Sequence, residues 1–191
     1  MNKLKLIISM ATSALLFISC SEANHQHVEH NNISTVKTEI SNVESAIALL
    51  YPTEGSDANG QVVFTKMEDG RIKVIAEVYN ISPGKHGFHI HEFGDCSSPD
   101  GKSAGGHFFT DYDNHGGLED HETHVGDLGN LEANEEGIAK ITFITDKLSF
   151  SGPNSILGRG VIVHAGEDDM KTQPTGGAGA RVACGVIGIS K

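Results

Sequence analysis

Three histidines stand at positions where their imidazoles could meet on one metal ion. His89 and His91 lie two positions apart in an apolar segment, so on a β-strand both side chains point to the same face. Taken alone, a His-x-His pair often has only a structural or surface role. His164 ends a second apolar segment and adds another imidazole. An imidazole-rich site without thiolate or thioether ligands suits Cu(II) or zinc.

A second group of candidate ligands falls in a long stretch rich in Gly, Asp and His. His107, His115 and His124 occur there, and Asp127 follows them closely. A loop has no core of its own to satisfy buried histidines, so a metal ion that organises it is an economical explanation. Three imidazoles and one carboxylate form a suitable tetrahedral zinc shell. The alternative to metal binding is that these are exposed polar side chains of a loop. That interpretation is favoured for each residue taken alone, but not for all four together.

The segments that must position these residues have the pattern of short β-strands. Apolar residues alternate with polar ones from Ile72 to Val78, and Asp69-Gly70 marks a hairpin turn just before them. Long loops are expected over 92–126 and 167–180. We predict an all-β fold, an eight-stranded antiparallel Greek-key barrel or sandwich with two long functional loops. The predicted strands are 46–51, 61–67, 72–79, 86–91, 127–132, 138–144, 159–164 and 181–189.

The N-terminal part of the chain has the composition of an export signal followed by a tether. Residues 1–20 have a basic start, an apolar stretch and a small residue before Cys20, the pattern of a lipoprotein signal peptide with Cys20 lipidated. A plain signal peptide cleaved nearby is the alternative. Residues 21–43 are polar, and we expect a flexible tether. Its histidines either bind metal weakly or are simply solvated; they are His25, His27 and His30.

These features predict an exported protein of the periplasm or cell envelope, anchored to a membrane surface by its lipid, with its folded domain over 44–191. Cys96 and Cys184 remain as an even pair, and in an oxidising compartment we expect them to join. The net charge of −11 and the absence of a basic stripe argue against nucleic acid as a partner.

Three motifs resemble signatures of the copper–zinc superoxide dismutase family. They are GFHIHEFGD over 87–95, HVGDLGN over 124–130 and GARVACGVI over 179–187. The resemblance runs from about Ala46 to the C-terminus. The segments around Cys96 and after His164 look like those of bacterial members. After His107-Phe108 many members have Asn-Pro, whereas this chain has Phe109-Thr110, which makes local loop packing a point of difference.

The resemblance implies a specific role for each candidate residue. Copper would be held by His89, His91, His107 and His164. Zinc would be held by His107, His115, His124 and Asp127. Asp168 would join ligand imidazoles of both metals and fix their orientation. The pairing of Cys96 with Cys184 would tie the long loop to the last strand. His86 would be structural, and His121 has no assignable role.

The implied activity is the conversion of two superoxide anions to oxygen and hydrogen peroxide by copper alternating between Cu(II) and Cu(I), with zinc structural and tuning. His107 would carry a proton, and Arg181 would guide the anion, with Lys102 and Lys171 as weaker candidates. A homodimer is the candidate assembly. A copper-buffering module is a rival hypothesis that the His-bearing tail favours, but such a protein has no need of Arg181. A purely structural β-sandwich would leave the histidines unexplained.

Overall fold

The computed structural model describes residues 42–191. The predicted signal peptide, Cys20, the three tail histidines and nearly all of the predicted tether lie outside the described residues. Within 42–191 no helix is long and apolar enough to cross a membrane. The described part is built from β-strands and one short 3₁₀ helix, η1 (Lys102–Ala104).

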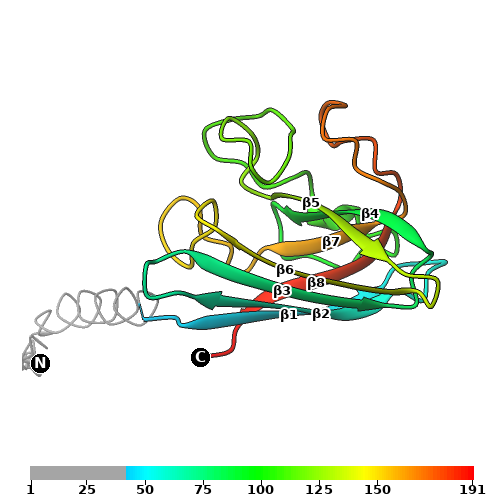
Figure 1. Cartoon of the computed structure of the whole chain (residues 1–191), viewed down its shortest axis with the longest axis horizontal. Coiled ribbons are helices and arrows are strands. Elements are labelled where there is room, and N and C mark those ends of the chain that lie inside the picture. Colours follow the sequence, from blue (N-terminus) through cyan, green and yellow to red (C-terminus); the bar gives the residue numbers. More distant parts are fainter. Residues whose placement is uncertain (1–41) are drawn as a thin grey trace, which may run out of the picture. The chain divides into compact units, whose positions relative to one another are not determined.

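Eight antiparallel strands close into a barrel in the order β1-β2-β3-β6-β5-β4-β7-β8 (Figure 1). Because β6 returns to lie beside β3, and β7 beside β4, the topology is a Greek key, and the predicted fold is confirmed. Both ends of each predicted strand lie within two residues of the corresponding ends of an observed strand. The strands are β1 (Ser45–Pro52), β2 (Asn59–Lys66), β3 (Ile72–Tyr79), β4 (Gly84–His91), β5 (Asp127–Ala133), β6 (Ile138–Thr145), β7 (Gly160–His164) and β8 (Arg181–Ile189).

Alternation along the strands builds the core inside the barrel. Along β3 every second residue from Ile72 to Val78 is buried, which matches the sequence pattern. Phe64, Phe88 and Leu131 are fully buried in the same cluster. Burying each side chain of this size stabilises the fold by about 1.5–3 kcal/mol. The barrel is therefore a well-packed support for the side chains on its outer face.

A turn over residues 134–137 joins β5 to β6, which are neighbours in the barrel. The turn forms, since the N–H of Gly137 donates to the carbonyl of Asn134 at 2.9 Å. Beyond it, β5 and β6 share one register pair, Ala133 with Ala139, because β5 pairs mainly with β4 and β6 pairs with β3. The two strands separate as soon as they leave the turn.

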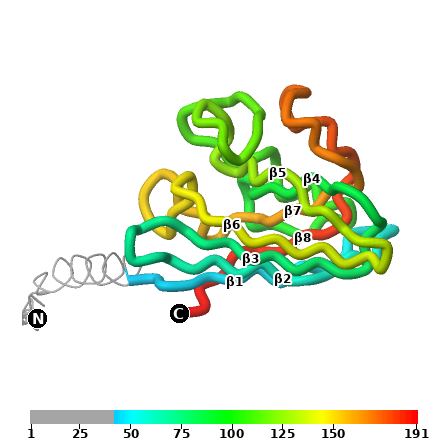
Figure 2. Tube along the Cα trace, in the orientation of Figure 1, coloured from blue at the N-terminus to red at the C-terminus, as the bar shows by residue number. Residues whose placement is uncertain are grey.

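Two long loops leave the barrel near β4, β5 and β7, and Figure 2 traces them in green and in orange. The first runs from the end of β4 to β5, and the second joins β7 to β8. Gly126 lets the first loop return beside β4, because a Cβ there would lie 2.1 Å from the carbonyl oxygen of Ile90. The loops thus cover the outer face of β4.

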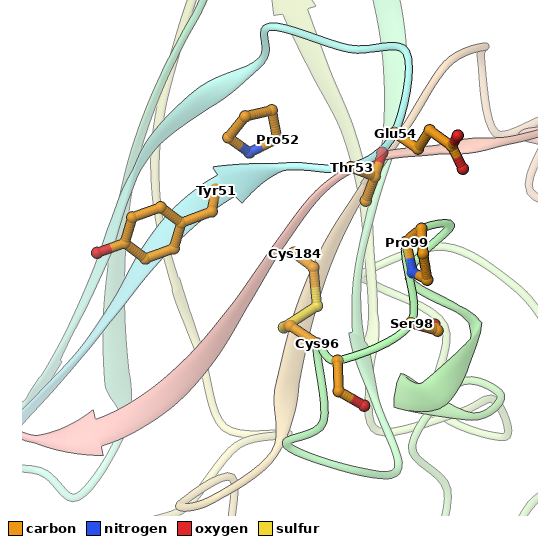
Figure 3. A pocket seen from close by; sticks show the side chains of 9 residues that line it. Tyr51, Pro52, Thr53, Glu54, Cys96, Ser98, Pro99 and Cys184 are labelled. Atoms are coloured by element: carbon orange, nitrogen blue, oxygen red, sulfur yellow. A yellow bond between two sulfur atoms is a disulfide. The ribbon is translucent and has the colours of Figure 1, made fainter.

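A disulfide joins Cys96 in the first loop to Cys184 in β8, as predicted. Figure 3 shows this bond beside a surface pocket that Tyr51, Thr53 and Pro99 also line. The bond ties the start of the first loop to the barrel wall.

Candidate metal centre

The strand β4 places two imidazoles outside the barrel and under the loops. Phe88 and Ile90 point into the core, so the alternate residues His89 and His91 point to the outer face. Both histidines are nonetheless fully buried, because the loops cover them. His107 pairs with His91 in an isolated β-bridge. The first loop therefore brings its imidazole directly to the strand.

Four histidines form the first cluster: His89, His91, His107 and His164. One nitrogen atom from each lies within 4.8 Å of the others. The nitrogens without a hydrogen-bond partner are Nδ1 of His89 and Nε2 of the other three. Leaving a buried polar atom unpaired costs free energy, so four such atoms together indicate a site built for a ligand. These residues fit a metal ion that prefers imidazole.

In three of these rings, a hydrogen bond at one nitrogen determines which nitrogen is left without a partner. Nδ1 of His91 donates to the carbonyl of Gly105 at 3.0 Å, and Nδ1 of His164 donates to the carbonyl of Gly179 at 3.1 Å. Nε2 of His89 donates to Asp168 at 2.8 Å. In a neutral ring the other nitrogen then carries a lone pair, which is what a metal ion requires.

Burial keeps these rings neutral. It lowers the pKa of His89 to about 3 and the pKa of His164 to about 4. The pKa of His91 is also lowered well below its usual value, first by burial and then by the nearby His107. Because metal ligation needs the unprotonated imidazole, the cluster is in a ligating state at neutral pH.

The second cluster converges on one oxygen of Asp127. Nδ1 atoms of three histidines lie close to Oδ1: His107 at 2.8 Å, His115 at 3.0 Å and His124 at 3.2 Å. The other oxygen of Asp127 accepts the N–H of Gly116 at 2.9 Å, which fixes the carboxylate. These contacts hold the pKa of Asp127 far below its usual range despite burial. The arrangement suits a tetrahedral cation site of three nitrogens and one oxygen.

His115 gives a specific reason to expect a cation there. Its Nε2 lies 2.8 Å from Oδ1 of Asp168, so a neutral ring would turn a bare Nδ1 toward Asp127. A lone pair facing a carboxylate is repulsive unless a proton or a metal ion lies between them. In the metal-free protein, burial opposes ionisation, but the hydrogen bonds to Asp127 and Asp168 prevail and raise the pKa of His115 to about 9.

By the distances between candidate ligand atoms alone, His89 also groups with three members of the second cluster: His107, His115 and Asp127. We assign His124 to this cluster instead, because Nε2 of His89 already donates to Asp168 while Nδ1 of His124 faces Asp127. The ring centroids of His89 and His107 are only 3.9 Å apart, which explains the overlap. His107 has Nδ1 in one cluster and Nε2 in the other.

The carboxylate of Asp168 connects the two clusters through a hydrogen bond to one ring of each. Its Oδ2 accepts from His89 and its Oδ1 from His115, each at 2.8 Å. The two hydrogen bonds outweigh burial and lower the pKa of Asp168. The carboxylate therefore stays ionised and fixes the orientation of one ring in each cluster.

Arg181 begins β8 beside the first cluster. Its guanidinium donates to the carbonyls of Gly101 at 2.5 Å and Gly105 at 2.6 Å. Lys102, one of the weaker candidates, is instead paired with Asp100 at 2.7 Å on the surface. His86 lies apart from both clusters, with Nδ1 2.8 Å from the carbonyl oxygen of His164.

Two supporting residues were not singled out from the sequence. The guanidinium carbon of Arg159 lies 3.3 Å from the ring centroid of Phe108, and its Nη1 donates to the carbonyl of Glu92. It thus contacts the residues that directly follow two cluster histidines, the main chain of Glu92 after His91 and the ring of Phe108 after His107. Asn130 bonds both main-chain groups of Asp168, at 2.8 and 2.9 Å. Asn130 lies in a quoted motif, but neither role leaves a signal in residue type or spacing.

A closed Greek-key barrel whose outer face carries two adjacent imidazole-rich clusters, sharing one histidine, defines a two-metal protein. The family model of copper/zinc superoxide dismutase (SODC) matches residues 58–187. An extracellular superoxide dismutase [Cu-Zn] of Brugia pahangi is 36% identical over 191 residues, covering 93% of this chain and 94% of that protein. The crystal structure of the clock protein EA4 matches with a TM-score of 0.70 and 42% identity, over 76% of this chain and 94% of that one.

The chain belongs to the copper/zinc superoxide dismutase family. It is an oxidoreductase that converts superoxide to oxygen and hydrogen peroxide, with copper and zinc as its cofactors.

Proposed function

We propose that the first cluster is the copper site and the second the zinc site of this dismutase. Copper would be held by His89, His91, His107 and His164. Zinc would be held by His107, His115, His124 and Asp127. The observation that carries the copper assignment is the set of four bare, buried imidazole nitrogens at one point. Zinc suits the second cluster because the carboxylate of Asp127 completes a tetrahedral donor set.

Copper, when bound, supplies the one-electron oxidation and reduction that dismutation needs, which zinc cannot supply. The protein contributes orientation and proton handling. Nδ1 of His107 faces Asp127 and is fixed, whereas Nε2 faces the first cluster and has no other partner. Nε2 is therefore the atom at which this ring can take up and return a proton.

Arg181 is proposed to attract the substrate, which is a small anion approaching a protein of net charge −11. Bulk repulsion slows such an encounter, but one positive group in a covered site focuses the local field. The carbonyls of Gly101 and Gly105 hold the guanidinium in place. Its charge also contributes to the lowered pKa values of His91 and His164, so it lies close enough to act at the first cluster.

The test is superoxide dismutation by the mature protein reconstituted with copper and zinc, compared with a His164→Ala variant. We expect fast turnover in the wild type, and loss of both turnover and one equivalent of tightly bound copper in the variant. Zinc content should not change. Tight copper binding with negligible turnover in the wild type would favour a copper-buffering role instead.

We also propose that the protein is exported as a bacterial lipoprotein, with cleavage directly before Cys20, lipid on Cys20 as the new N-terminus, and a tether joining the anchor to a dismutase domain over 44–191. The disulfide and the extracellular relative support export. Mass spectrometry of the mature N-terminus tests the anchor. A diacylglyceryl mass on Cys20 that disappears in Cys20→Ser is expected, and an unmodified N-terminus elsewhere would contradict it.

A homodimer is the proposed assembly. Large apolar side chains are exposed on and beside β8, including Phe93 at 56% and Val186 at 43%. The two lie in one region, because a Cβ at Gly94 would lie 2.9 Å from Val186. Exposed apolar patches of this kind mark protein contacts. Sedimentation velocity should give a dimer that Phe93→Glu converts to monomers, and a monomeric wild type would reject the proposal.

A further inference from the structure

The main chain of His115 is held by a side chain from the other loop. The N–H of His115 donates to Oε1 of Gln173 at 2.9 Å, and Nε2 of Gln173 donates to the carbonyl of His115 at 3.0 Å. One amide therefore satisfies both main-chain groups of His115, as a neighbouring strand would. Within residues 42–191, His115 has no main-chain partner.

The other members of the second cluster are anchored differently. His107 lies in a β-bridge with His91, and Asp127 begins β5. The N–H of His124 donates to the carbonyl of Asn114 at 2.9 Å. Each of these three takes its position from the main-chain hydrogen bonds of the fold. His115 is the member whose own main-chain N–H and carbonyl are both bonded by one side chain, while its neighbours Asn114 and Gly116 are held by His124 and Asp127.

The loop between β7 and β8 thus holds His115 at two points. Asp168 fixes the ring through Nε2, and Gln173 fixes the main chain. A histidine held only through its ring or only through its main chain can still turn or withdraw. A histidine held through both presents its imidazole to the cluster in one orientation. Positioning of this kind commonly changes metal affinity by about 10- to 100-fold.

We propose that Gln173 is a positioning residue that sets how firmly zinc is retained, acting through His115 and not on the metal. The proposal rests on the zinc set given above. It also assigns the second loop a role in holding zinc that is separate from the carboxylate of Asp168. The copper cluster has no contact with Gln173 in the described residues, so copper retention should be insensitive to it.

The experiment compares Gln173→Met with Gln61→Met in the copper- and zinc-loaded protein. Methionine keeps the length of the side chain but removes both amide hydrogen bonds, and Gln61 gives the same substitution on β2, away from the centre. Transfer of zinc to a coloured chelator gives the release rate. We expect release about tenfold faster in Gln173→Met, with copper content and urea unfolding of the metal-free protein unchanged. Cobalt(II) alone, bound in place of zinc, should show shifted visible bands in this variant.

A His124→Ala variant separates this inference from the zinc assignment itself. If His124→Ala loses zinc rapidly while Gln173→Met releases it at the wild-type rate, the role of Gln173 is rejected and the zinc set stands. If His124→Ala retains zinc as the wild type does, the zinc set is wrong and the inference falls with it. A change in Gln173→Met that is confined to unfolding of the metal-free protein would also reject it.

Discussion

The carbonyl oxygen of Gly105 accepts a hydrogen bond from Nη2 of Arg181 at 2.6 Å. The same oxygen lies 3.0 Å from Nδ1 of His91. One main-chain carbonyl thus joins the proposed anion guide to an imidazole of the first cluster. Because Cys96 tethers the loop that carries Gly105, the position of the guanidinium depends on a segment that the disulfide holds against β8.

Replacing Arg181 with Ala should lower the rate of superoxide encounter by roughly tenfold at low salt and flatten its salt dependence, because the local positive charge is lost. Pulse radiolysis at several ionic strengths measures both quantities. Lys102→Ala is the control, since Lys102 is already paired with Asp100 and should have little effect. An unchanged rate at low salt in Arg181→Ala would contradict the proposed role.

Asp168→Asn should weaken metal retention by about 10- to 100-fold, because an amide cannot accept from both His89 and His115. Metal content after dialysis against a chelator measures this. Asp169→Asn is the matched control, because Asp169 accepts its hydrogen bonds from the exposed residues Lys171 and Thr172. Equal retention in the two variants would mean that Asp168 does not orient the rings.

Gly176→Ala should destabilise the second loop and speed metal loss. A Cβ at this position would lie 1.8 Å from Oδ1 of Asp168 and 2.6 Å from Nε2 of His115, and its φ of +70° disfavours any other residue. We expect about 1–3 kcal/mol less stability from the backbone alone. Gly152→Ala has a similar φ but open space around it, so it isolates the effect of crowding. Similar metal loss in both variants would point to backbone strain alone.

The metal-free protein should lose stability as the pH falls from about 6.5 toward 4. Burial lowers the pKa of His89 to about 3 and of His164 to about 4, so over this window the unfolded chain binds more protons than the folded one. Stability then decreases with decreasing pH. Thermal unfolding of the metal-free protein between pH 4 and 7 tests this, and His164→Gln should show a shallower slope. A midpoint independent of pH would contradict the buried neutral state.

Removing the disulfide should cost about 4–5 kcal/mol in the chain-entropy treatment, because the bond spans a sequence separation of 88 residues. Urea unfolding of the metal-free Cys96→Ser/Cys184→Ser double variant measures the loss. Wild type treated with a reductant should unfold at the same urea concentration as the variant. If both unfold like the oxidised wild type, the bond contributes little beyond holding the loop.

Most of the barrel could be predicted from the sequence, because each strand carries its own signal. The alternation from Ile72 to Val78 indicates both the strand and its buried face. What the residues could not indicate is which strands pair after a turn. The turn at Asn134 joins β5 to β6 as a hairpin does, yet the two strands share only one register pair, because β5 pairs mainly with β4 and β6 with β3.

The candidate site was predicted by residue type, while its supports were not. His89 and His91 share a strand face by simple periodicity, the composition of the long loop led to His107 and His115, and the family resemblance led to Asp168. Gln173 and Arg159 act through main-chain carbonyls and an aromatic ring of other loops. Such contacts depend on how two loops meet in space, and no spacing along one segment specifies that.

The closed strand order has a consequence for the protein at high local concentration. Open sheets present edges to which strands of other molecules can add, and this barrel has none. The seam between β5 and β6, with its one register pair, is where an edge would first appear. Since β5 begins at Asp127, a cation bound there by histidines of the preceding loop would fasten the free end of β5, and so restrain one of the two strands of that seam.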